Sequence, residues 1–232
     1  MSILVFVEDW NGAYKKASFE AVAYAKSWAT MNGNRVIAVT STSAPAGELA
    51  GYGADHIIQI GLGSTAMGIA GQLKELSVEA SGIVIAGTSL GRSLAPALSA
   101  LTGGALSTNT ISLPLSVSPL QVKRGAFSSK GIETIELNND MPIVSFVPNS
   151  IGLEPVAGEG NLERREVSSN DALEVLSTEV ASGKVALPEA EAVVSAGRGL
   201  KGPENWGMIE ELADVLGAAT ACSKPVSDIG WR

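Results

Sequence analysis

Short β-branched apolar runs alternate with segments of helical period over the first hundred residues. The runs are residues 3–7, 35–40, 56–60 and 82–86, and between them apolar side chains recur every three or four positions. Gly33 and Gly103 stand where the first and third helices are expected to end. This alternation predicts an α/β fold, in which a mainly parallel sheet is flanked by helices. The apolar faces of the three helices are expected to hold Ala21, Val22, Ala25, Trp28 and Ala29; Ile69, Ala70, Leu73 and Leu76; and Leu94, Ala97, Leu98 and Leu101.

The pattern changes after Gly104, where apolar runs follow one another without helical segments between them. Residues 128–131 have turn composition, and they are expected to join the first two of these runs as an antiparallel hairpin. The sequence therefore predicts that further strands, some of them antiparallel, extend the parallel sheet. The predicted strands are residues 121–127, 132–137, 142–147, 162–168 and 173–180.

A loop at residues 181–190 separates this region from a shorter final segment. We place the boundary after Pro188, which gives an amino-terminal α/β domain at residues 1–188 and a second domain at 189–232. The second domain begins with a strand at 192–195, a glycine turn and a helix from Pro203 to Gly217. Another short strand at 218–222 completes one β-α-β unit. The helix has an apolar face of Trp206, Ile209, Leu212, Ala213 and Leu216.

Composition and charge narrow the classes of function. The chain has 232 residues, is 45% apolar and carries a net charge of −8, so it can build a core but is repelled by nucleic-acid phosphates and anionic lipids. Residues 93–122 carry no charge, yet Pro96, Pro114 and Pro119 interrupt them, which argues against a membrane-spanning helix. The single cysteine, Cys222, cannot form an internal disulfide, which is typical of a reducing compartment. We therefore expect a cytoplasmic protein that neither binds nucleic acid nor inserts into a membrane.

The clearest chemical motif is Gly197-x-Gly199-x-x-Gly202, which lies between a predicted strand and a predicted helix. Such glycines let backbone N–H groups approach a pyrophosphate at the positive end of a helix. A dinucleotide site of the ordinary kind also has an acidic residue about 20 positions later, to bind a ribose hydroxyl. Ser223 and Lys224 stand there instead. Lys224 could contact a phosphate or stabilise a reduced, anionic ring; a plain helix-start turn with a surface lysine is the other interpretation.

Other candidate sites are weaker. Gly61-x-Gly63-x-x-Ala66 also follows a strand, and Glu79 stands at roughly the right distance from it; because Glu79 is expected at the end of a helix and not at a strand tip, a structural turn is favoured. The loop at 87–93 contains hydroxyl groups and Arg92, which could hold an anion, although it lacks the lysine of a phosphate-binding loop. The one histidine, His56, is far in sequence from Cys222, so we predict no catalytic triad and no metal site.

Taken together, these segments resemble the alpha subunit of an electron transfer flavoprotein along essentially the whole chain. The main marker is the segment 193–201, Val-Val-Ser-Ala-Gly-Arg-Gly-Leu-Lys, followed by Glu204-Asn205-Trp206. This combination is similar to the start of the family's flavin domain. Supporting segments are residues 86–92, 122–127 and 223–228.

The resemblance implies an electron carrier and not an enzyme. A member of this family pairs with a beta subunit, carries FAD, takes electrons from dehydrogenases such as the acyl-CoA dehydrogenases of fatty acid β-oxidation, and passes them to a membrane-bound quinone oxidoreductase. AMP is expected in the beta subunit. The first domain is expected to have the Rossmann-like fold of adenine nucleotide hydrolases.

Site residues are carried over from the family position by position. Arg198 and Ser223 match residues that contact FAD, and the glycine turn implicates Gly197 and Gly199. Lys224 matches an arginine beside the isoalloxazine ring. Lysine keeps the positive charge but lacks the planar guanidinium, so the flavin potential should be tuned differently.

The family's flavin domain also continues through segments that this sequence does not contain, among them a Gln-Thr-Gly motif. We therefore expect that the chain alone does not retain FAD. Two alternatives stay open at this point. One is a free-standing nucleotide-binding module that uses the 87–93 loop; the other, an NAD-dependent oxidoreductase, is disfavoured by Lys224.

Overall fold

The structure, a computed structural model, describes residues 1–10, 12–43, 45–177, 187, 190 and 192–231. Two compact units are present, at residues 1–175 and 176–232, and each is described by itself. The boundary predicted after Pro188 lies outside the described residues and stays a prediction.

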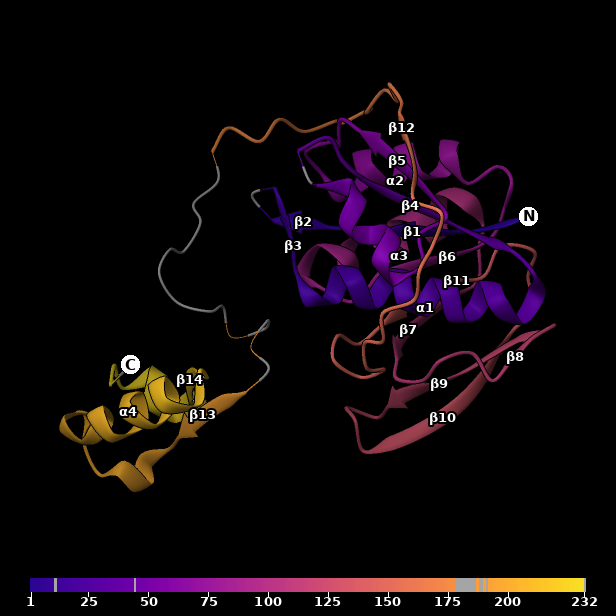
Figure 1. The fold of residues 1–232 in the computed structure, drawn as a ribbon. Coiled ribbons are helices and arrows are strands. Elements are labelled where there is room, and N and C mark those ends of the chain that lie inside the picture. Colours follow the sequence, from indigo (N-terminus) through magenta and orange to yellow (C-terminus); the bar gives the residue numbers. More distant parts are fainter. Residues whose placement is uncertain (11, 44, 178–186, 188–189, 191, 232) are drawn as a thin grey trace. The chain divides into compact units, whose positions relative to one another are not determined.

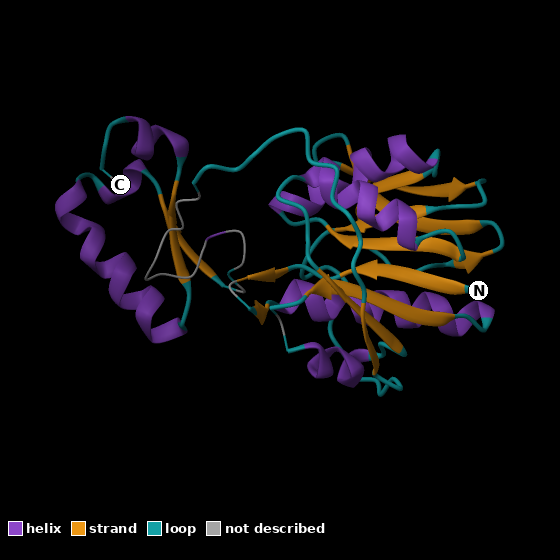
Figure 2. Cartoon of the chain, turned by 90° about the horizontal axis from the view of Figure 1, so that it is seen from above, coloured by secondary structure: helices purple, strands orange, loops and turns teal. Residues whose placement is uncertain are grey.

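The first unit is a three-layer α/β structure built on one large sheet (Figures 1 and 2). Its strand order is β10-β9-β7-β11-β6-β1-β4-β5-β12, with β8 paired to β9. Seven adjacent strands, β7, β11, β6, β1, β4, β5 and β12, run parallel to one another. β9 and β10 form an antiparallel hairpin at one edge of the sheet. The strands are β1 (Ser2–Phe6), β4 (Arg35–Ser41), β5 (His56–Ile60), β6 (Ala80–Ala86), β7 (Leu106–Thr110), β8 (Ser116–Val117), β9 (Leu120–Ala126), β10 (Gly131–Leu137), β11 (Ile143–Phe146) and β12 (Asn161–Arg164).

Helices cover both faces of this sheet (Figure 2). Residues of β1 alternate between two apolar clusters, because Ile3 and Val5 pack on the side of α1 while Leu4 and Phe6 pack on the side of α2 and α3. All five residues of β1 are buried, as expected for a central strand of a parallel sheet. The helical elements are α1 (Lys16–Asn32), the 3-10 helix η1 (Ala46–Tyr52), α2 (Ala66–Leu76) and α3 (Ser89–Thr102), and a small hairpin of β2 (Asp9–Trp10) and β3 (Ala13–Tyr14) precedes α1.

The helix stops expected from the sequence are confirmed. Gly33 and Gly103 have φ angles of +67° and +72°, a left-handed conformation that glycine adopts without steric cost. Thr65 and Thr88 cap α2 and α3, and each hydroxyl accepts a hydrogen bond from an amide three residues later.

Three expectations differ from the structure. No strand forms at residues 173–177, and the rest of the strand predicted at 173–180 lies outside the described residues. The strand predicted at 162–168 is shorter and spans only Asn161–Arg164. β7 and η1 were not predicted, because the short polar run in β7 lacks the apolar alternation by which a strand is recognised.

A strap at residues 156–171 runs back along one edge of the first unit (Figure 1). Backbone amides of Val156, Gly158 and Gly160 donate to carbonyls of residues 50, 51 and 54, and β12 then pairs with β5. Glu163 on β12 accepts hydrogen bonds from Arg165 and contacts His56 Nε2 at 2.8 Å, and these contacts lower the pKa of Glu163 to about 2. The carboxylate is therefore ionised at neutral pH and helps to hold the strap against β5.

The second unit is small in its described part. Its strands β13 (Val193–Ala196) and β14 (Ala219–Cys222) pair in parallel, with Ala196 opposite Cys222. Trp206 and Ala213 are buried as predicted, but Leu212 and Leu216 are 49% and 57% exposed, so the expected apolar face of the helix is only partly covered. The remaining elements are η3 (Arg198–Leu200), η4 (Pro203–Trp206), α4 (Gly207–Leu216) and α5 (Lys224–Asp228).

None of the helices in the described part of the chain has the length and apolar character that a membrane span requires.

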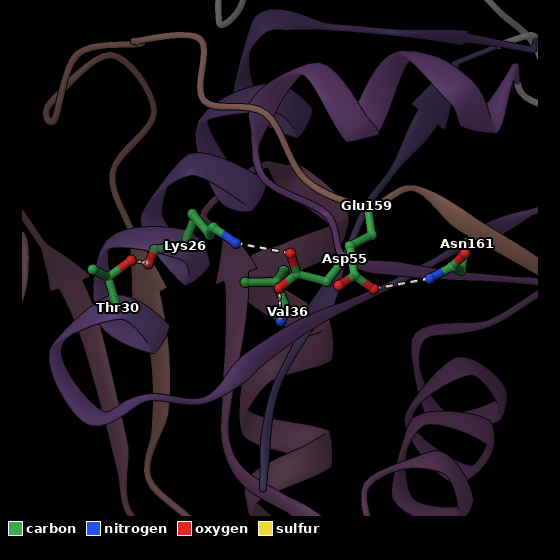
Figure 3. Close-up of polar contacts among 6 residues, drawn as sticks. All are labelled: Lys26, Thr30, Val36, Asp55, Glu159 and Asn161. Atoms are coloured by element: carbon green, nitrogen blue, oxygen red, sulfur yellow. Dashed lines mark hydrogen bonds and ion pairs between the residues drawn. The ribbon is translucent and has the colours of Figure 1, made fainter.

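Asp55 joins α1 to the start of β4 through its buried carboxylate (Figure 3). One oxygen accepts from Lys26 Nζ at 2.8 Å and the other from the Val36 amide at 2.9 Å. Glu159, drawn in the same view, is exposed and accepts a hydrogen bond from Asn161.

We predict that Asp55→Ala lowers the free energy of unfolding by about 2 kcal/mol, because it leaves a buried amide and an ammonium without their acceptor. Urea unfolding followed by circular dichroism measures the change. Glu159→Gln is the matched control and should stay within about 0.5 kcal/mol of the parent. Equal losses in the two variants would contradict this role of Asp55.

Candidate functional site

The carboxyl ends of the parallel strands are where α/β sheets bind ligands, especially where the strand order reverses. In the first unit β1 is flanked by β4 on one side and β6 on the other, so the reversal lies between the ends of β1 and β6. Two glycine-containing loops reach this edge of the sheet, at residues 61–65 and 87–88.

The 87–93 loop is closed by groups of the protein itself. Glu8, just after β1, accepts a hydrogen bond of 2.5 Å from the Thr88 hydroxyl across the point of strand reversal. The Gly87 amide donates to the Phe146 carbonyl, and an added Cβ at Gly91 would lie 1.8 Å from the Ala86 carbonyl oxygen. Arg92 is exposed. The tight packing and the Glu8 carboxylate both oppose a phosphate here.

The 61–65 loop is a structural turn, as predicted. Its amides at Ser64 and Thr65 donate to the carboxylate of Asp171, at 2.8 and 3.2 Å. Gln72, fully buried on α2, also binds the Gly63 amide and the Gly61 carbonyl. The donors that a phosphate would need are already used.

A pocket of about 860 Å³ lies at the opposite edge of this sheet. It is lined by residues at the amino ends of β1, β4, β5 and β6, among them Arg35, Glu79 and Asp140. Its mixed charges define no single ligand chemistry, and it is far from the strand ends where this fold class binds cofactors.

The second unit offers a more open arrangement at its own strand ends. Gly197 follows β13 and Ser223 follows β14, and the Ser223 amide donates to the Ala196 carbonyl at 3.0 Å. A Cβ placed on Gly197 would lie 3.6 Å from Ser223 Oγ, so the two predicted site residues are neighbours. Gly197 and Ser223 are thus close in space although 26 residues separate them in the sequence.

Charge and access at this edge fit a phosphate-bearing cofactor. Arg198 and Lys224 are exposed, and they follow Gly197 and Ser223 directly in the sequence. A Cβ on Gly199 would meet no heavy atom within 4 Å, so its backbone is accessible to a ligand. All five predicted site residues therefore lie on η3, at the start of α5, or directly before these elements.

Gly202 differs from the expectation for a pyrophosphate turn. A Cβ there would lie 2.2 Å from both carboxylate oxygens of Glu204, so this glycine accommodates an acidic side chain of the protein. The part of the motif that stays open to a ligand is thus limited to Gly197 through Gly199, and sequence spacing alone did not reveal this.

Other chemistry is poorly supported. Among the described residues, no three histidine, cysteine or acidic side chains come together as metal ligands. His56 contacts Glu163 on β12, and Cys222 is a partly buried thiol at the end of β14.

Two family models match this chain. Residues 3–172 match the electron transfer flavoprotein domain, and residues 186–232 match the electron transfer flavoprotein FAD-binding domain. The candidate edge formed by Gly197–Gly199 and Ser223–Lys224 lies within the second match.

Curated relatives agree with these matches. Electron transfer flavoprotein subunit alpha of Syntrophomonas wolfei is 28% identical over 98% of the chain, and that of Mycobacterium tuberculosis is 31% identical over 99%; the chain spans 74% of each. The lactate dehydrogenase (NAD(+),ferredoxin) subunit LctC of Acetobacterium woodii is 27% identical over 99% of the chain, which spans 59% of that protein. On this evidence the chain belongs to the family of electron transfer flavoprotein alpha subunits.

Proposed function

We propose that this chain is the electron-transfer subunit of a heterodimeric flavoprotein and is not an enzyme by itself. The observation that carries the proposal is the open, positively charged edge formed by Gly197–Gly199 and Ser223–Lys224 at the ends of two parallel strands. Its place within the match to the FAD-binding domain supports FAD as the cofactor.

Each site residue has a role in this proposal. The backbone from Gly197 to Gly199, with Arg198 and Ser223, binds polar groups of FAD, because amides, a guanidinium and a hydroxyl are suitable donors to phosphate and carbonyl oxygens. Lys224 lies beside the flavin ring, where its ammonium favours the anionic reduced form. FAD, when bound, supplies the redox chemistry; the protein side chains hold and orient it.

Partners follow from the family. We propose a beta subunit that holds AMP, dehydrogenases as electron donors, and a quinone oxidoreductase as acceptor, all in the cytoplasm or at its membrane surface. Acyl-CoA dehydrogenases of fatty acid β-oxidation are the donors we expect first. The similarity to a subunit of a lactate dehydrogenase supports testing other dehydrogenases beside them.

We predict that the 232-residue chain alone binds FAD with a dissociation constant weaker than about 1 μM. The described part of its second unit has a sheet of only two strands, and Leu212 and Leu216 of α4 are exposed, whereas cofactor sites bury most of the ligand. Fluorescence titration of FAD into the purified chain measures the constant. A yellow protein that retains flavin through gel filtration would contradict the prediction.

A matched test addresses the site itself. FAD is titrated into each variant up to partial saturation. Lys224→Glu and Arg198→Glu should each raise the dissociation constant for FAD about tenfold or more, because each reverses a charge beside an anionic ligand. Lys201→Glu, which reverses an exposed charge outside the proposed contacts, is the control. Equal effects of all three would indicate a general charge effect and no specific site.

The alternative, a free-standing nucleotide-binding module that uses the 87–93 loop, is tested by calorimetry with AMP and ATP. We predict no saturable binding to this loop, because the Glu8 carboxylate already contacts Thr88. Saturable binding that Arg92→Ala abolishes would favour the alternative.

A further inference from the structure

The strap at residues 156–171 is held by backbone hydrogen bonds along most of its length and by side-chain hydrogen bonds at its end. After β12, the Arg165 amide donates to the Gln59 carbonyl at 3.0 Å. The side chain of Gln72 then donates to the Val167 carbonyl at 2.8 Å, while its oxygen accepts from the Gly63 amide. This buried glutamine connects the strap to the 61–65 loop.

Asp171 is the last contact of the strap. Its carboxylate accepts hydrogen bonds from the amides of Ser64 and Thr65, from the Thr65 hydroxyl and from the Ser169 hydroxyl. Three of these four donors belong to the loop that starts α2. Over a hundred residues of sequence separate the carboxylate from this loop, so the contact fixes one end of the strap in space.

The loop is shaped to receive this carboxylate. A Cβ on Gly63 would lie 2.9 Å from one Asp171 carboxylate oxygen, and a Cβ on Gly68 would lie 2.0 Å from the other. Neither position has a positive φ angle, so what glycine provides at both is space for the Asp171 carboxylate. The two glycines and the aspartate therefore form one packing unit.

We propose that Asp171 is the terminal anchor of the strap: its carboxylate binds the 61–65 loop as an internal ligand and fixes the end of the strap on the first unit. Electrostatics supports the anchor, since a carboxylate is stabilised by the positive end of α2 and by two loop amides. These hydrogen bonds lower the pKa of Asp171 to about 2, so the anchor is charged at neutral pH.

The chain changes character directly after the anchor. Residues 172–177 are exposed, including the apolar side chains of Leu173 and Leu176 at 72% and 86%. Without Asp171 the last contact would be that of Gln72 with Val167. Loss of the anchor would thus release residues 168–171 and lengthen the segment that leads to the second unit.

Hydrogen exchange of the 232-residue chain, read by mass spectrometry, tests the proposal without FAD or a partner. In Asp171→Ala, amide exchange in a peptide covering residues 64–65 should rise about tenfold, because both amides lose their acceptor, while exchange in β1 stays unchanged. Ser169→Ala, which removes one of the four donors, should give a smaller rise in the same peptide.

Glu174→Gln is the matched control, because it removes an exposed carboxylate three residues beyond the anchor. It should leave exchange at residues 64–65 within twofold of the parent. The proposal is overturned if Asp171→Ala also stays within twofold, or if the control raises exchange as much as Asp171→Ala does. If Asp171→Ala does not fold, Asp171→Asn replaces it, and unchanged exchange in that variant overturns the proposal equally.

Discussion

The first unit depends on the burial of both faces of its central parallel strands. Every residue of β1 is buried, and successive side chains enter different apolar clusters, so helices must cover both faces of the sheet. Parallel strands connected by helices direct their carboxyl ends to one edge, where the connecting loops begin. The loops that reach that edge expose amides at helix starts, and these amides need acceptors.

In the first unit these acceptors belong to the protein itself. Before α2, the Asp171 carboxylate accepts from the Ser64 and Thr65 amides. At α3, the Thr88 hydroxyl accepts from the Gly91 amide and donates in turn to Glu8. The second unit differs, because Gly199 is open to a ligand and Arg198 and Lys224 supply positive charge. The three glycine-containing loops, at residues 61–65, 87–93 and 197–202, look similar in sequence but differ in structure. The atoms that lie close to their glycines show the difference. Only the loop of the second unit combines access with positive charge.

Much of the architecture was predictable from hydrophobic periodicity. The runs at 3–7, 35–40, 56–60 and 82–86 became strands because long-range burial agrees there with local β propensity. β7 was not predicted, because its polar residues gave no sign that they are buried. Ser107 and Thr110 are buried in the structure, and their hydroxyl groups share a hydrogen bond. The strand expected at 173–180 is wrong for residues 173–177, which have the right composition but are exposed.

The candidate site was also predictable in part. The turn at Gly197–Gly199 and the strand tip at Ser223–Lys224 were predicted from the sequence, and the parallel register of β13 and β14 makes them neighbours. The roles of Glu204 against Gly202 and of Asp171 against the 61–65 loop were not found. Which glycine faces an acidic side chain depends on tertiary contacts; for Asp171 the contact spans 107 residues, and no local pattern encodes it.

The most direct test of the account is a map of amide protection by FAD in the complex of this chain with its beta subunit. The account predicts that FAD protects residues 197–199 and 223–224, while residues 61–65 and 87–93 keep the exchange rates of the flavin-free complex. Protection of either first-unit loop, with none at residues 197–199 and 223–224, would contradict it.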